Sequence, residues 1–214
     1  MNGYQELNVL FERYPALEAC RQEIAAAYEL LRGCFAAGGR LLVCGNGGSA
    51  ADSLHIVGEL MKGFALPRKL SADWEARFEQ VCPEMALYLM ENLQGALPAV
   101  SLVGETALST AYANDQAPDL NFAQQVLGQG RAGDVLLCIS TSGNSTNVLY
   151  AAAVARAMEL RVIGLAGQGG GRLKGLSDVC ICAPSRITYQ IQEYHLPIYH
   201  ALCLALEREF FGEA

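Results

Sequence analysis

The residues best suited to chemistry are three histidines, which fall in two short segments. His55 lies four residues before Glu59, a spacing that puts both side chains on one face of a helix. His195 and His200 lie in the segment Gln192-Glu193-Tyr194-His195-Leu196-Pro197-Ile198-Tyr199-His200. Imidazole and carboxylate groups in this arrangement suit a metal site or acid–base catalysis, and the same His/Glu pair also suits an ordinary surface or core contact.

The second segment sets a geometric condition on any shared site. Gln192 and His200 are eight residues apart, which on a straight helix means about 12 Å of rise and about 80° of rotation. Two side chains so placed reach one ion only with difficulty. Either a kink at Pro197 brings them together, or a site draws its ligands from different chains and the oligomer is part of the site.

A glycine-rich loop supplies a candidate anion site. The sequence Gly45-Asn46-Gly47-Gly48-Ser49 leaves an apolar run and opens a helix, where backbone amides attract anions and glycine allows close approach. The spacing Gly45-x-Gly47-x-x-Ala50 also fits a dinucleotide fingerprint, but residues 64–69 lack the acidic residue which that fingerprint requires. No Gly-Lys-Ser/Thr follows, so the loop is not a Walker A motif, and a glycine turn that only packs helix against strand remains the alternative.

A second polar loop, Ser140-Thr141-Ser142-Gly143-Asn144-Ser145, follows the apolar run 135–139. Four hydroxyls lie where a helix should begin, and Ser145 suits its N-cap. Hydroxyls and helix amides together favour a phosphate monoester, although a polar turn with a capping serine has the same composition.

An alternation of strands and helices must position these residues. The spacing of apolar residues predicts helix over 5–37, stopped by Gly38-Gly39. Strand-length apolar runs occur at 41–44, 99–103, 135–139, 162–166 and 179–183, and helical stretches at 48–62, 105–130, 145–159 and 187–210. This order predicts an α/β fold with a parallel sheet between helices, in which both loops lie at the carboxyl edge where ligands bind.

One segment departs from the alternation. Residues 63–98 contain Pro67 and Pro98 and have an amphipathic middle from Trp74 to Leu93. We interpret the chain as one domain, 1–214, with a helical insertion at about 63–98 that acts as a lid or an oligomer contact.

Composition narrows the class of protein. Of the 214 residues, 52% are apolar and 17% charged, which supports a real core and excludes disorder. The net charge of −7 and the lack of a basic stripe argue against nucleic acid, and no apolar run approaches the length that spans a membrane. The N-terminus shows no secretory signal, and the eight irregularly spaced cysteines fit reduced core residues, so we expect a cytoplasmic protein.

Four motifs in combination resemble the SIS (sugar isomerase) domains, and within them the phosphoheptose isomerases, which interconvert sedoheptulose 7-phosphate and glycero-manno-heptose 7-phosphate. The motifs are Cys44 to Ser49, Asn114-Asp115, Gly133 to Ser145, and Ile191 to His200. The resemblance implies a three-layer sandwich with a five-stranded, flavodoxin-like parallel sheet. It also implies a homotetramer, or a dimer, with active sites shared between subunits and a phosphorylated sugar as substrate.

The resemblance also implies roles for individual residues. The substrate phosphate would lie on Ser140, Thr141, Ser142 and Ser145, and the sugar on Asn46, Gly47, Gly48, Ser49, Asn114 and Asp115. One zinc ion per subunit, with no nucleotide cofactor, would be bound by His55, Glu59, Gln192 and His200. Glu59 and His200 match the pair assigned to proton transfer, and Glu59 and Gln192 would also contact substrate. A carboxylate base and a histidine acid suit isomerisation through an enediol.

Two departures leave the substrate open. Tyr189 stands where these enzymes usually have an acidic residue, and Gly63, beside Lys62, where they usually have an arginine. An isomerase of another sugar phosphate is therefore one alternative. A second is a non-catalytic SIS protein, such as the relatives that bind the bacterial replication initiator, which lack the glutamate and the second histidine that Glu59 and His200 represent.

Overall fold

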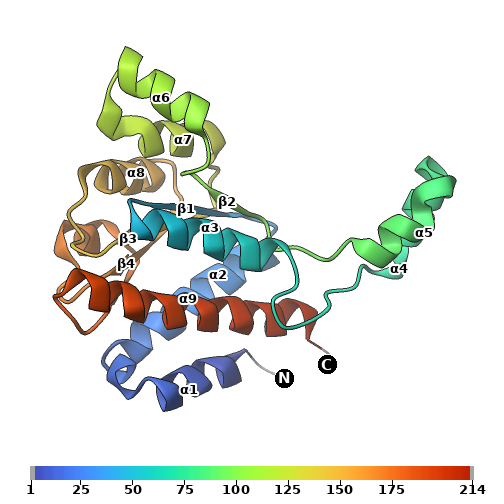
Figure 1. Ribbon diagram of the computed structural model, residues 1–214, viewed down its shortest axis with the longest axis horizontal. Coiled ribbons are helices and arrows are strands. Elements are labelled where there is room, and N and C mark those ends of the chain that lie inside the picture. The colour runs from blue at the N-terminus through green and yellow to red at the C-terminus, as the bar shows by residue number, and fades with distance from the viewer. Residues whose placement is uncertain (1–2, 213–214) are drawn as a thin grey trace.

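Five apolar runs form a parallel sheet in the computed structural model, which describes residues 3–212 (Figure 1). The strands are β1 (Leu41–Gly45), β2 (Ala99–Ser101), β3 (Val135–Ser140), β4 (Arg161–Ala166) and β5 (Val179–Cys182). They pair in the order β2-β1-β3-β4-β5, all parallel, with Leu41 opposite Val135. Every residue of β1 and β3 is buried, as expected of strands covered on both faces. The predicted fold class is confirmed.

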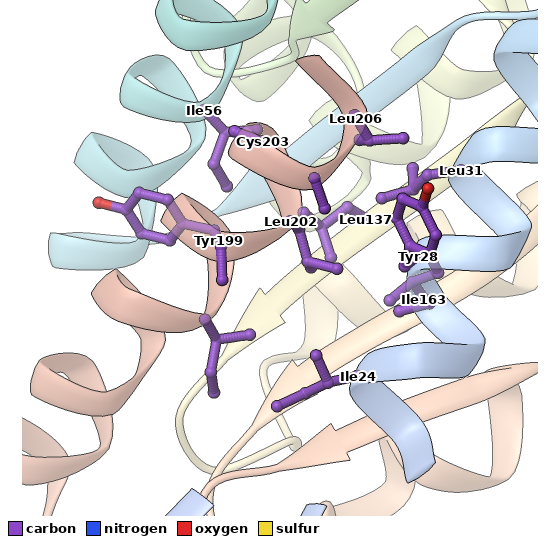
Figure 2. Close-up of a cluster of buried hydrophobic side chains, with 14 of the residues drawn as sticks. Ile24, Tyr28, Leu31, Ile56, Leu137, Ile163, Tyr199, Leu202, Cys203 and Leu206 are labelled. Atoms are coloured by element: carbon purple, nitrogen blue, oxygen red, sulfur yellow. The ribbon is translucent and has the colours of Figure 1, made fainter. Parts of the chain in front are cut away.

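Helices cover both faces of the sheet. The elements are α1 (Tyr4–Arg13), η1 (Pro15–Cys20), α2 (Arg21–Ala36), α3 (Gly48–Met61), α4 (Ala72–Val81), α5 (Pro83–Asn92), α6 (Thr106–Asp115), η2 (Pro118–Leu120), α7 (Asn121–Gln129), α8 (Thr146–Ala157), η3 (Gly171–Leu176) and α9 (Thr188–Phe211). One core cluster joins the sheet to α1, α2, α3 and α9, and Figure 2 shows part of it. The second cluster joins the opposite face to α7, α8 and η3. The result is a three-layer sandwich.

Prolines divide two segments that the sequence pattern predicts as single helices. Residues 5–37 break before Pro15 and residues 105–130 before Pro118. The preceding residues, Tyr14 (φ −131°, ψ 72°) and Ala117 (φ −149°, ψ 119°), lie outside the helical region. Proline disfavours that region for its predecessor, which gives both divisions a local steric cause.

The segment predicted as a helical insertion forms a hairpin of α4 and α5 that projects from the body of the fold (Figure 1). No side chain of α4 is buried, and Ala86 is the only buried residue of α5. Large apolar side chains are exposed on it, including Val81, Leu87 and Tyr88. Its role as a lid or an oligomer contact stays a prediction.

Most of the cysteines are core residues, as their apolar neighbours in the sequence indicate. All eight cysteines are free, and six are buried, while Cys82 and Cys182 are partly exposed. Among the helices of residues 3–212, none has both the length and the apolar character needed to cross a membrane.

Candidate active site

Helices α3 and α9 lie side by side and run parallel (Figure 1). This arrangement determines which residue of α9 faces each polar residue of α3. At the start of α3, a Cβ built on Gly48 would overlap Nε2 of Gln192. Two turns further on, His55 contacts the rings of Tyr199 and His200. Partners along the contact thus keep a nearly constant separation in sequence, so residues at the same level of the two helices meet.

His55 and Glu59 form the predicted pair on one face of α3. Their Nε2 and Oε1 atoms are 3.1 Å apart, and Lys62 Nζ lies 3.2 Å from the other oxygen of Glu59. The side chain of Glu59 is 13% exposed and that of His55 is 42% exposed. A mostly buried carboxylate with an open imidazole beside it can accept a proton or bind a cation.

His200 brings a second imidazole to this pair. Its ring centroid is 5.0 Å from that of His55, with the planes nearly perpendicular, and 5.4 Å from that of Phe64. Burial lowers the pKa of His200 below its usual value; His55 and Arg13 act in the same direction and Glu59 against it. Its Nε2 is buried, and no other group of residues 3–212 hydrogen-bonds to it. Burial therefore favours the neutral imidazole, and one polar atom of the ring has no partner among the described residues.

Gln192 does not join this cluster. It lies beside Gly48, just over two turns along α9 from His200, about 12 Å by helix rise. The helix continues through Pro197 without interruption, and His200 lies beside His55, two turns further along α3 than the Gly48 that Gln192 contacts. One chain brings together His55, Glu59 and His200 and leaves Gln192 apart.

The fit of these residues to a zinc ion is partial within one chain. Two ligands of a tetrahedral zinc, with bonds of about 2.0–2.1 Å, lie about 3.3 Å apart, close to the 3.1 Å between His55 Nε2 and Glu59 Oε1. His200 adds a neutral imidazole nearby. However, no group of three His, Cys, Asp or Glu side chains in residues 3–212 is arranged to hold a metal ion. The donor chemistry fits zinc, and the set is incomplete without a further donor.

The serine-rich loop joins β3 to α8 as predicted. Ser145 is the N-cap residue of α8, but its hydroxyl lies 3.0 Å from that of Ser140 and does not cap the helix. Gly143 has a positive φ of 64°, and a Cβ there would overlap Gly170 O, so only glycine fits. The first amides of α8 therefore lack a capping side chain from Ser145, as an anion site requires.

The two loops are held to each other by a contact that the sequence analysis did not identify. Asn46 Nδ2 donates to Asn147 Oδ1 at 2.8 Å, and Asn147 Nδ2 donates to Asn46 Oδ1 at 2.9 Å. Within the first loop, Gly47 has a φ of 57° and Ser49 is buried. Thr141 and Ser142, which carry the remaining hydroxyls of the second loop, directly follow β3. Ser142 Oγ accepts from the Asn144 amide at 3.1 Å.

Asn114 and Asp115 lie apart from the cluster. They are the last residues of α6, which packs on η2 and α7 rather than on α3 or α9 (Figure 1). Both are exposed, and Asn114 Nδ2 donates to Asp115 Oδ1 at 2.8 Å. No side chain of α6 is buried. The structure of one chain does not bring these two residues to the other candidates.

Comparison with known proteins gives one consistent result. The family model described as "SIS domain" matches residues 5–80 and 79–167. A phosphoheptose isomerase from Thiobacillus denitrificans is 42% identical over 200 residues, covering 92% of this chain and 88% of the relative. The structure of a phosphoheptose isomerase from Neisseria gonorrhoeae superposes with a TM-score of 0.73 at 33% identity over 95% of this chain and 94% of the other. One from Francisella tularensis gives 0.73 at 30% identity, covering 97% and 100%.

Proposed function

The chain belongs to the SIS domain family and, within it, to the phosphoheptose isomerases, and we propose that it interconverts sedoheptulose 7-phosphate and glycero-manno-heptose 7-phosphate. The observation that carries the proposal is the cluster of His55, Glu59 and His200 between α3 and α9. It combines a mostly buried carboxylate with a neutral imidazole, the two groups that an enediol mechanism needs.

The substrate phosphate is assigned to the loop Ser140–Ser145 and the first turn of α8. Hydroxyls of Ser140, Thr141, Ser142 and Ser145 and the helix amides bind it without a cationic side chain, which agrees with the acidic composition of the chain. Asn46, Gly47, Gly48 and Ser49 border the sugar from the neighbouring loop. The paired amides of Asn46 and Asn147 keep the two loops in register for one ligand.

Proton transfer is assigned to Glu59 and His200. Glu59 takes the proton from the carbon next to the ketose carbonyl, and His200 donates a proton to the carbonyl oxygen, giving the enediol. Glu59 then returns its proton to the former carbonyl carbon while the hydroxyl on the other carbon gives its proton to His200, which yields the aldose with no net oxidation. Burial lowers the pKa of His200 and so favours its neutral form, in which the ring nitrogen that bears hydrogen can donate to the substrate oxygen.

We assign zinc binding to His55, Glu59, His200 and Gln192, one ion per subunit. Bound zinc would polarise the carbonyl and hydroxyl oxygens of the substrate. Gln192 is about 12 Å along α9 from His200, so a complete donor set takes Gln192 from a neighbouring subunit.

This requirement supports a homotetramer, or a dimer, with shared active sites. Two further features fit an assembly: α6, which carries Asn114 and Asp115, buries no side chain, and the hairpin of α4 and α5 exposes large apolar residues. A subunit packed on α6 would complete the substrate site with residues that one chain leaves apart. We place the enzyme in the cytoplasm, in keeping with its free cysteines.

A second candidate is isomerisation of a different sugar phosphate. A Cβ on Gly63 would lie 2.5 Å from Leu66 O, so the loop after α3 has no room for the arginine that these isomerases usually have there. Tyr189, where they usually have an acidic residue, is exposed at the start of α9. The residues at these two positions alter the surface that would contact the sugar, while Glu59 and His200, the proposed proton-transfer residues, are unchanged.

The test is turnover by the purified protein, first stripped of metal and then supplied with zinc. Sedoheptulose 7-phosphate is the substrate, with fructose 6-phosphate alongside. Zinc-dependent conversion of the heptulose supports the substrate, the reaction and the metal together. Conversion of fructose 6-phosphate alone favours the second candidate, and a folded protein silent on both sugars contradicts the proposal and favours a binding role.

A further inference from the structure

We propose that Tyr199 and Asp52 are positioning residues that fix the orientation and the tautomer of His55, so that its Nε2 lone pair faces Glu59. Tyr199 lies on α9, while Asp52, His55 and Glu59 follow one another along one face of α3. The inference rests on the proposed function, because it concerns the metal-binding and catalytic cluster. It adds two residues to which no role has been given above.

Hydrogen bonds through the Tyr199 hydroxyl, on α9, link Asp52 and His55 of α3. The hydroxyl of Tyr199 donates to Asp52 Oδ1 at 3.3 Å, and the same hydroxyl oxygen lies 3.0 Å from His55 Nδ1. A phenol has one proton, and a carboxylate has none to give. Because the Tyr199 proton points to Asp52, His55 Nδ1 is the donor to the Tyr199 oxygen.

The tautomer of His55 follows from that direction. A neutral imidazole carries one N–H, so a proton on Nδ1 leaves the lone pair on Nε2. This nitrogen lies 3.1 Å from Glu59 Oε1. Two acceptor atoms at this distance repel each other unless a proton or a cation lies between them. The hydrogen bonds that begin at Asp52 thus favour binding of a cation between His55 and Glu59.

Packing makes the arrangement rigid. Tyr199 is 2% exposed, and in Figure 2 its ring leaves α9 and its hydroxyl points to α3. Its ring meets that of His55 edge to face, at 5.5 Å and 78°. The second oxygen of Asp52, Oδ2, is buried and no group of residues 3–212 hydrogen-bonds to it, so Tyr199 is the one hydrogen-bond donor that Asp52 has within that range.

The direct test is the substitution Tyr199→Phe, which removes one hydroxyl and keeps the ring. Its matched control is Tyr28→Phe, because Tyr28 is a fully buried tyrosine whose hydroxyl bonds Glu209 at 3.1 Å, outside the cluster. Nitrogen-15 NMR of the imidazoles in metal-free protein at about pH 8.5, where an ordinary histidine is neutral, reports which nitrogen carries the proton. With three histidines in the chain, His195→Gln and His200→Asn assign the signals.

We expect Nδ1–H on His55 in the parent protein and in Tyr28→Phe, and a shift towards Nε2–H in Tyr199→Phe. Zinc affinity, measured by competition with a chelating dye, should fall about 10- to 100-fold in Tyr199→Phe, as for other residues that orient a metal-binding histidine. An unchanged tautomer in Tyr199→Phe, or Nε2–H in the parent, overturns the inference. A parent protein that shows the expected tautomer but neither binds zinc nor isomerises the heptulose contradicts the proposed function and leaves the inference supported.

Discussion

Removing the guanidinium of Arg68 should destabilise the protein strongly. Arg68 is fully buried, and its Nε donates to Glu207 at 2.7 Å. Its other nitrogens donate to the carbonyls of Leu60 at 2.6 Å and Glu59 at 2.8 Å, which closes the end of α3. Glu207 also accepts the amides of residues 64–66, at 2.7–3.2 Å. The Arg68–Glu207 pair therefore fixes the end of α3, the helix that carries the proposed base, and the loop that follows it.

The magnitude follows from these contacts. Arg68→Met leaves the Glu207 carboxylate buried without its cation and leaves two carbonyls without donors. Loss of one partner of a buried ion pair costs about 3–5 kcal/mol. The three backbone amides that still bind Glu207 offset part of the loss, and the freed carbonyls add to it. For a chain of this size each kcal/mol lowers the melting temperature by about 2–4 °C, so we expect a fall of about 6–20 °C.

The assay is thermal unfolding followed by circular dichroism, with Arg161→Met as the matched control. Arg161 Nη1 lies 3.2 Å from Asp178, and the arginine side chain is 57% exposed. A surface pair of this kind contributes at most about 1 kcal/mol, so the control should shift by about 4 °C or less. If the melting temperature of Arg68→Met also falls by about 4 °C or less, the claim that the buried Arg68–Glu207 pair stabilises the end of α3 is refuted.

Three further predictions concern the loops, the helix contact and the response to acid. Ser142→Ala should raise KM for a sugar phosphate more than it lowers kcat, with an unchanged circular dichroism spectrum; a lost fold would point to a structural role instead. Gly48→Ala should reduce kcat/KM at least about 10-fold because its Cβ displaces Gln192, while Gly58→Ala, with open space at its Cβ, should stabilise α3 by about 0.5–1 kcal/mol and keep full activity. Burial lowers the pKa of His195 to about 4 from a usual value of 6.5, so the unfolded chain binds the extra proton between these pH values and stability falls as pH drops through this window, by about 3 kcal/mol in total. The difference in melting temperature between the parent and His195→Gln should therefore change from pH 7 to pH 4. A difference that stays constant over this range would contradict the lowered pKa of His195.

The sheet and the loops were predictable because local sequence determines them. A buried parallel strand is a short apolar run, and glycine or serine must follow where the backbone turns or an anion is bound. The pairing of His55 with Glu59 and the separation of Gln192 from His200 follow from helix geometry alone. The divisions at Pro15 and Pro118 were also accessible, since the residue before a proline is biased away from the helical region.

The contacts between distant segments were not predictable. Tyr199 meets Asp52 across 147 positions of sequence, and Arg68 meets Glu207 across 139. Neither pair has a spacing that marks it, and each depends on how α9 lies against α3. The amphipathic pattern from Trp74 to Leu93 likewise predicts an apolar face but does not say what covers it. Within one chain that face stays largely open.

The most direct test of the central claim is the kcat/KM for sedoheptulose 7-phosphate of the zinc-loaded parent protein and of Glu59→Gln, measured side by side. The account predicts turnover by the parent and a fall of about 10²–10⁴-fold in Glu59→Gln, the usual contribution of a general base, with melting temperature and oligomeric state unchanged. Undiminished turnover in Glu59→Gln would contradict the assignment of the α3–α9 cluster as the active site.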